Sequence, residues 1–300
     1  MWRKIRLLLI ISGLVVAFNA NAQFDDPKTL EVGPHVGLSY YMGDLNPALP
    51  FAMADLEYGG LVRFNYNNRW TFRCDYAYAT VKADDEKIKW RPERCLNFTS
   101  KIHDLSFVAE FNFWEYYTGN PKRNVSPYIF GGISVFYYTV FANVGGNLVD
   151  LSDHKTEPLP TEPKWYDKAF GKTSPIGISI PFGMGVKFAL SRRMAGTVEW
   201  RMQKTFTDYL DDVATVYPDD DKHACFIDNG LYYDLTDPTA TPSGIPVNAE
   251  GNPIESPNGR YTSNQQRGNS AFNDWFGMAR VSLTWKFNLP DGRGCNLSKF

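Results

Sequence analysis

Two pairs of a histidine and a serine have residue types that could carry out nucleophilic chemistry. They are His35 with Ser39 and His103 with Ser106. A histidine that takes a proton from a serine hydroxyl activates that nucleophile, and small membrane barrels that act on lipids place such groups near the membrane surface. Neither pair lies in a nucleophile motif, and the spacing is that of any polar strand face. We therefore expect no enzyme, and keep a lipid-modifying enzyme as an alternative.

An acidic stretch opens the longest polar segment of the chain. It contains Asp208, Asp211 and Asp212 and then Asp219 to Asp221. Carboxylate oxygens bind calcium, but the EF-hand spacing is missing. No Cys-x-x-Cys or Cys/His cluster indicates another metal site. We expect a solvated loop here, without a metal or another cofactor. The net charge of -2 gives no argument for a nucleic-acid partner, and no small-molecule substrate is expected.

The first residues predict export from the cytoplasm. Basic residues at positions 3, 4 and 6 precede an apolar run over residues 7–18, and Ala20-Asn21-Ala22 follows as a cleavage pattern. The apolar run is too short to cross a hydrocarbon core of about 30 Å comfortably as an anchor. We therefore predict a signal peptide over residues 1–22 and a mature chain that starts at Gln23.

The rest of the chain alternates apolar and polar residues in short segments, as strands do when one face meets lipid. The alternating segments are 30–42, 58–66, 70–79, 102–114, 127–140, 176–190, 194–203 and 275–287. Segment 127–140 is apolar on both faces, so its orientation stays open. Aromatic residues recur on one face of nearly every segment, which favours membrane girdles over a soluble all-β fold. We predict an all-β, antiparallel up-and-down transmembrane barrel of about eight strands in the cell outer membrane.

The connections between these segments alternate strictly in length. The short ones lie at 67–68, 116–126 and 191–192, and the long ones are 43–57, 81–101, 141–175 and 205–272. Outer-membrane barrels have short periplasmic turns and long extracellular loops. We therefore expect the barrel to occupy residues 23–288 with the long loops at the cell surface, and residues 289–300 to form a periplasmic C-terminal tail.

Charged residues recur on the faces that would point into the barrel. They are Glu31, Arg63, Arg73, Asp75, Asp104, Glu110, Lys187, Glu199, Arg201, Arg280 and Lys286. Eight strands enclose a space that side chains just fill, and buried charges are tolerated when they are paired. We expect a plug of salt bridges, and the alternative is a narrow path for ions or protons.

Cysteines in an exported chain can form disulfides, because the compartments outside the inner membrane are oxidising. The expected topology puts Cys95 and Cys225 in long loops on the same side, which makes them a candidate disulfide. Cys74 falls on the lipid-facing parity and serves there as a small hydrophobe. Cys295 is then left without a partner in the tail.

Five segments resemble the PorG family of outer-membrane barrels, which belong to the type IX (Por) protein secretion system of Bacteroidetes-type bacteria. They are residues 37–47 (GLSYYMGDLNP), 68–70 (NRW), 127–132 (PYIFGG), 180–185 (IPFGMG) and 206–213 (FTDYLDDV). The first and last are the most specific, and the long final loop departs from the family pattern.

The resemblance implies a non-enzymatic component of the translocation machinery. Its implied partners are a PorK-like lipoprotein and a PorN-like protein, which form a ring on the periplasmic side. On that reading the tail, with Cys295 and Phe300, is a candidate contact for the ring. The other function that remains open, besides the lipid-modifying enzyme, is an orphan surface or adhesion barrel.

Overall fold

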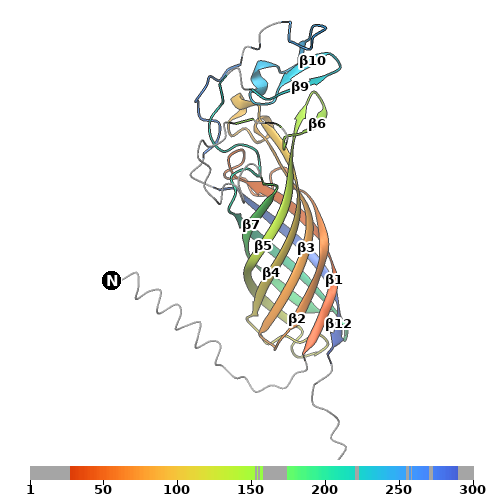
Figure 1. Cartoon of the computed structure of the whole chain (residues 1–300). Helices are drawn as coiled ribbons and strands as arrows, with labels where there is room; N and C mark the ends of the chain where they lie inside the picture. The colour runs from red at the N-terminus through yellow and green to blue at the C-terminus, as the bar shows by residue number, and fades with distance from the viewer. Residues whose placement is uncertain are drawn as a thin grey trace, which may run out of the picture.

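A closed antiparallel barrel of eight strands dominates the structure (Figure 1). The computed structural model describes residues 28–152, 154, 156–157, 174–219, 223–254, 257, 259–269 and 273–289. The barrel strands are β1 (Thr29–Met42), β2 (Asp55–Asn65), β3 (Trp70–Asp84), β4 (Asn97–Asn112), β5 (Val125–Val144), β7 (Ile176–Ala189), β8 (Met194–Thr205) and β12 (Trp275–Asn288). The predicted fold class is confirmed.

The barrel closes because its first and last strands pair. Each barrel strand also pairs with the next one along the chain, and β1 thus lies between β12 and β2. In this register Val36 of β1 lies opposite Val281 of β12 on one side and Tyr58 of β2 on the other. A closed sheet has no free edge, so its backbone polar groups can bond within the wall, which is the condition for crossing lipid.

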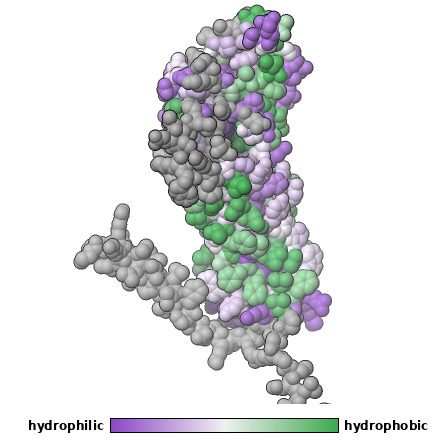
Figure 2. All heavy atoms as spheres, in the orientation of Figure 1, coloured by the Kyte–Doolittle hydropathy of each residue, from purple (hydrophilic) through white to green (hydrophobic). Residues whose placement is uncertain are grey.

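The outer wall carries an apolar band between two levels of tryptophan. On β12, Trp275 and Trp285 lie ten residues apart on the outward-facing parity. Ten residues of a strand tilted by about 40° rise about 25 Å, which is the height of the lipid-facing band of outer-membrane barrels. Figure 2 shows apolar side chains gathered on the barrel wall. The chain is an outer-membrane barrel, as predicted.

The two ends of the barrel differ in their connections. At one end, here called the turn end, the connections are residues 66–69, 113–124 and 190–193, and Leu289 N donates to Lys28 O where the chain enters and leaves. At the other, the loop end, the connections are residues 43–54, 85–96, 145–175 and 206–274. No helix among the described residues is long and apolar enough to cross a membrane.

The loop end has secondary structure of its own. Its elements are α2 (Asp85–Ile88), η1 (Pro92–Arg94), β6 (Asn147–Asp150), β9 (Cys225–Asp228), β10 (Leu231–Asp234), η3 (Pro238–Ala240) and β11 (Ile245–Pro246). Strand β6 pairs with the end of β5, whereas β9, β10 and β11 form a separate small sheet. The described parts of the long connections therefore form a cap above the wall, as Figure 1 shows.

Several strands continue beyond the ends that the sequence predicts. The expected loop 81–101 is shorter, because β3 and β4 remain paired up to Asp84 opposite Asn97. The expected loop 43–57 likewise ends earlier, since β2 begins at Asp55. Polar residues alternate with lipid-facing apolar residues only in the part of a strand that lies within the membrane. The sequence pattern therefore ends before the hydrogen-bonded strands do.

The barrel interior is apolar toward the loop end. Buried residues from β3, β4 and β5 meet loop residues there, among them Val81, Ile102, Phe136, Leu210 and Val213. This core also resolves the orientation of β5, whose inward residues in the upper half are aromatic or aliphatic. Since its outward residues face lipid, β5 has to be apolar on both faces.

Candidate functional site

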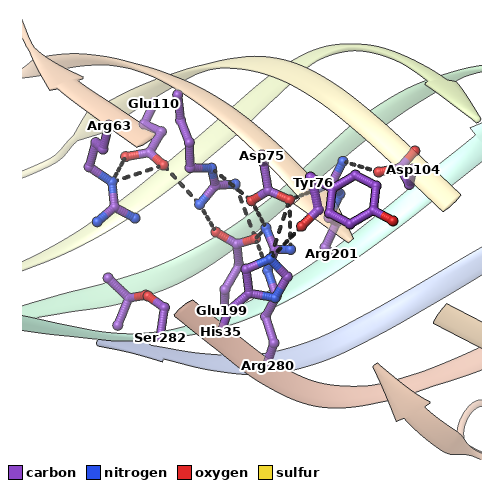
Figure 3. Close-up of polar contacts among 12 residues, drawn as sticks. His35, Arg63, Asp75, Tyr76, Asp104, Glu110, Glu199, Arg201, Arg280 and Ser282 are labelled. Carbon is purple, nitrogen blue, oxygen red and sulfur yellow. Dashed lines mark hydrogen bonds and ion pairs between the residues drawn. The ribbon is translucent and has the colours of Figure 1, made fainter. Parts of the chain in front are cut away.

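A network of buried charges fills the barrel between the turn end and the apolar core. Figure 3 shows these side chains pointing toward one another from strands around the wall. The members that the sequence predicts, apart from Lys286, all lie buried there, namely Glu31, Arg63, Arg73, Asp75, Asp104, Glu110, Lys187, Glu199, Arg201 and Arg280. Lys286 lies at the rim of the turn end, half-buried, where its Nζ donates to Thr118 O.

Arg280 of β12 lies at the centre of this network. Its guanidinium contacts Asp75 Oδ2 at 2.7 Å and Glu199 Oε1 at 2.8 Å. Arg73 reaches the same Glu199 from the opposite wall, with Nη1 to Oε2 at 2.6 Å, and Tyr128 also donates its hydroxyl to that carboxylate at 2.6 Å. Such shared, charge-assisted hydrogen bonds satisfy both signs of charge at once.

Glu110 connects the centre to the turn end. It contacts Arg63 Nε at 3.1 Å, Arg73 Nη1 at 2.9 Å and Lys187 Nζ at 2.6 Å. Arg63 continues the chain of contacts to Glu31, with Nη1 to Oε2 at 3.2 Å. The network therefore crosses the interior from β1 and β2 through β3 and β4 to β7.

Arg201 extends the network toward the loop end. Its guanidinium lies 3.2 Å from Asp104 Oδ2 and 3.4 Å from Asp75 Oδ1. Gln203 of the same strand also donates to Asp104 Oδ2, at 3.0 Å. These contacts end directly below the apolar core.

The paired side chains of the interior are almost completely shielded from solvent. In each ion pair among Arg63, Arg73, Lys187, Arg201 and Arg280 and their acidic partners, both side chains are 0–2% exposed. A water-filled passage along these groups would expose them to a probe of water size. What the arrangement can do is neutralise buried charge and hold opposite walls of the barrel together.

Two members of the network were not predicted from the sequence. Glu57 falls in the predicted loop 43–57, but it lies inside β2 and contacts His35 Nδ1 at 2.8 Å and Arg280 Nη1 at 3.5 Å. His35 was considered only as a possible catalytic base. The signal for Glu57 was its parity, which it shares with Arg63.

The histidine–serine pairs do not form catalytic pairs. His35 contacts Glu57, whereas Ser39 Oγ donates to Thr80 O at 2.7 Å. His103 faces outward and Ser106 inward, because an odd spacing along a strand places two side chains on opposite faces. The spacing of His35 and Ser39 is therefore that of a polar inner strand face. His103 and Ser106 lie on opposite faces of their strand.

A buried acidic cluster lies at the loop end. The Tyr41 hydroxyl oxygen lies at hydrogen-bonding distance from two carboxylates, 2.5 Å from Asp211 Oδ2 and 2.6 Å from Asp274 Oδ1. Burial and the neighbouring Asp274 carboxylate hold the pKa of Asp211 well above its usual range. Burial and the Asp211 carboxylate likewise raise the pKa of Asp208 to about 9. Asp211 and Asp274 are buried and Asp208 is partly buried, so this part of the acidic stretch is not the solvated loop that the sequence predicts.

The acidic stretch does not gather into a metal site in the described part of the chain. Asp212 accepts a hydrogen bond from Thr156, and Asp219 accepts one from Ser263 at 2.6 Å. No group of three or more potential ligands among the described residues is placed to hold a metal ion. Residues 220 and 221 lie outside the described residues.

The candidate disulfide between Cys95 and Cys225 does not form, and both residues are free thiols. Cys95 follows η1 with its Sγ 3.5 Å from Pro92 O, whereas Cys225 starts the separate sheet beside Tyr232. Both residues lie at the same end of the barrel, but Cys225 belongs to the separate small sheet, where it lies opposite Asp234. Cys74 lies on the outward parity of β3. Cys295 and Phe300 lie outside the described residues.

Comparisons with known proteins found several solved structures with low similarity to this chain and one family. No curated protein matches the chain. Neisserial surface protein A (NspA) matches 87% of this chain over 97% of its own, at 10% identity and a TM-score of 0.37. OprG from Pseudomonas aeruginosa matches 88% over 97%, at 8% identity and a TM-score of 0.37. Ail of Yersinia pestis matches 87% over 99%, at 10% identity and a TM-score of 0.35.

One family matches directly, over residues 5–157, which include β1 to β6. Its description is "Domain of unknown function (DUF6089)". The match spans more than half of the 300 residues, so the chain belongs to the DUF6089 family.

Proposed function

We propose that this protein is a non-enzymatic outer-membrane component of a type IX secretion machinery, and that it acts through its surfaces and not through its interior. The observation that carries the proposal is the filled barrel, whose interior charges are paired and 0–2% exposed. A barrel that is filled in this way offers cargo no path. It can instead anchor other components to the outer membrane.

The two most specific segments of the PorG resemblance support this assignment. Residues 37–47 and 206–213 lie far apart in the chain but meet at the loop end. There the hydroxyl of Tyr41, from the first segment, donates to Asp211, from the second. Asn46 of the first segment is also buried, and its side chain donates to Tyr41 O at 2.9 Å. The shared residues therefore form one structural unit, as expected for residues that maintain a common architecture.

The turn end has the charge of a docking surface. Its described residues are predominantly basic, with Lys28, Arg69, Lys122, Arg123, Arg192, Arg193 and Lys286 against Glu115. Lys28, Lys122, Arg192 and Arg193 are exposed. Charge complementarity directs encounter and orientation at interfaces, so the face of the periplasmic ring that meets this end should be acidic. We assign the contact with the PorK-like and PorN-like ring to this surface.

The experiment is recovery of the ring proteins with a tagged barrel from solubilised outer membranes. The test variant carries Lys122→Glu, Arg192→Glu and Arg193→Glu, and the matched control carries Lys89→Glu and Arg260→Glu at the loop end. The proposal predicts that only the test variant loses most of the PorK-like and PorN-like proteins, while both variants reach the outer membrane. Equal recovery by wild type and test variant would contradict the turn-end assignment, and no recovery by wild type would contradict the secretion assignment itself.

An adhesion barrel is the competing function. It would use the loop end, where β9, β10 and β11 form a separate sheet above the wall. The same two variants separate the functions, because secretion depends on the turn end and adhesion on the loop end. Loss of attachment to host cells or surfaces in the control variant, with secretion unchanged, would favour adhesion.

A further inference from the structure

A cleft of about 720 Å³ opens on the outer surface of the barrel at the loop end. Met42 of β1, Met202 of β8 and Trp275 of β12 form its lower wall. All three have the outward, lipid-facing parity of their strands. Trp90 and Arg91, from the connection between β3 and β4, line it from above. The cleft therefore lies outside the barrel and is separate from the charged interior.

The height of the cleft coincides with the membrane surface. Trp275 marks the upper edge of the apolar band, about 25 Å above Trp285. Girdle aromatics of outer-membrane barrels lie at the level of the lipid headgroups. A ligand in this cleft would thus have its apolar part against the upper band and its polar part among the headgroups.

One cation lies beside Trp275, and another lines the cleft. Lys204 lies directly opposite Trp275 in the ladder between β8 and β12, and its Nζ is 5.6 Å from the centre of the Trp275 ring. It is an exposed lysine on the lipid-facing parity. Arg91 lines the cleft, and its Nε contacts Glu93 at 3.5 Å, an ion pair exposed enough to be weak.

Arg91 lines the cleft itself, whereas Lys204 lies beside its lining residue Trp275. The other charged groups that line the cleft are already engaged. Arg94 is buried and bound to Asp85 through two hydrogen bonds of 2.8 and 2.9 Å. Asp44 accepts a hydrogen bond from Asn269 N at 2.6 Å, and burial raises its pKa from the ordinary value. Lys204 and Arg91 therefore remain as the cations that can meet a ligand, so the cleft favours an anion.

We propose that this cleft binds a phosphorylated lipid of the outer leaflet. In this proposal the acyl chains lie along Met42, Met202 and Trp275, and the phosphate meets Arg91 in the cleft and Lys204 at its edge beside Trp275. An exposed lysine beside a girdle tryptophan can bind a headgroup phosphate, because the aliphatic part of its side chain remains in lipid while the ammonium group reaches the membrane surface. The inference does not depend on the secretion function and holds for any role of the barrel.

The test uses the full-length mature protein in detergent micelles, with monophosphoryl lipid A as the probe and native mass spectrometry as the readout. The test variant is Lys204→Gln with Arg91→Gln. Lys101→Gln is the matched control, because Lys101 also stands over an aromatic ring, with its Nζ 4.8 Å from the centre of Phe141. Heat-dependent migration on gels checks that each barrel is folded.

The proposal predicts one-to-one binding that is about tenfold or more weaker in the test variant, since each interfacial cation contributes on the order of 1 kcal/mol. The control should bind within about twofold of wild type. Unchanged binding by the folded test variant would overturn the proposal. Equal binding of the fully dephosphorylated lipid would also overturn it, as would full competition by millimolar inorganic phosphate, which would indicate a site for a free anion.

Discussion

The hydroxyl of Tyr41 lies 2.5 Å from Oδ2 of Asp211, although the two residues are 170 positions apart in the chain. This hydrogen bond joins the end of β1 to the longest connection of the loop end. Asp274 Oδ1 lies 2.6 Å from the same hydroxyl oxygen, and Asp274 Oδ2 accepts a hydrogen bond from Leu210 N at 3.0 Å. The bond therefore ties the longest loop to the barrel rim, and the stability of the loop end should respond to charge in this cluster.

The first prediction concerns that response to pH. Burial and Asp211 raise the pKa of Asp208 to about 9 from an ordinary value of 3.8. The folded state therefore holds a proton that the unfolded state releases, and this contribution to stability is full below about pH 4 and lost as pH rises through about 9. Asp208→Asn should raise the thermal midpoint at pH 9 and leave it nearly unchanged at pH 4. A variant less stable than wild type at pH 9 would refute the buried-acid assignment.

The second prediction concerns the centre of the charged interior. Arg280→Met leaves Asp75 and Glu199 without a main partner and should lower the free energy of unfolding by about 3–5 kcal/mol. Lys82→Met removes a pair that is about a third exposed, with Nζ 2.8 Å from Asp55, and should cost about 1 kcal/mol or less. Urea unfolding in micelles measures both. Similar losses in the two variants would mean that the interior network does not hold the barrel together.

The sequence predicts the part of the structure within the membrane better than the part above the membrane. Within the membrane, alternation of apolar and polar residues identifies the barrel strands other than β5, which is apolar on both faces, and places residues such as Asp75 and Arg280 inside. Above the membrane, Ala79, Val81 and Ala83 face a buried core, so an apolar residue there no longer indicates a face in contact with lipid. There the pairing depends on contacts between distant segments, such as Tyr41 with Asp211, which no local pattern contains.

In the candidate site, too, some features follow from the local sequence pattern and others depend on contacts between distant segments. The charges of the interior follow from strand parity, whereas their pairing depends on side-chain reach across the barrel. Glu57 was missed because β2 begins at Asp55, two residues before it, in a stretch without clear alternation. The outer cleft could not be predicted either, since it combines Trp90 and Arg91 of one connection with strands on another part of the wall.

The third prediction concerns orientation in the membrane. Cys225 is an exposed free thiol at the loop end, and Arg192 is exposed at the turn end. In a background with Cys74→Ser, Cys95→Ser and Cys295→Ser, a membrane-impermeant maleimide should label Cys225 in whole cells. With Cys225→Ser and Arg192→Cys, labelling should require a permeabilised outer membrane. The reverse pattern would show that the long loops face the periplasm.

The fourth prediction concerns the C-terminal tail, which we propose contributes to the ring contact. Truncation after Leu289 keeps the Leu289 N to Lys28 O hydrogen bond that joins the ends of the barrel. The truncated barrel should assemble normally but recover less of the ring proteins. Cys295→Ser separates a thiol-dependent contact from one made by the rest of the tail. If the truncated protein recovers the ring proteins at the wild-type level, the tail takes no part in the contact. The contact would then be made by the basic turn end alone.

The central claim is that the interior of this barrel is filled, so that the protein works through its surfaces. Conductance of the purified mature protein in planar lipid bilayers measures this directly. We predict no channel steps for the folded wild type, because the ion pairs of Arg73, Arg201 and Arg280 occupy the interior with 0–2% exposure. Regular single-channel steps from folded wild-type protein would contradict the account and indicate an ion path through the barrel.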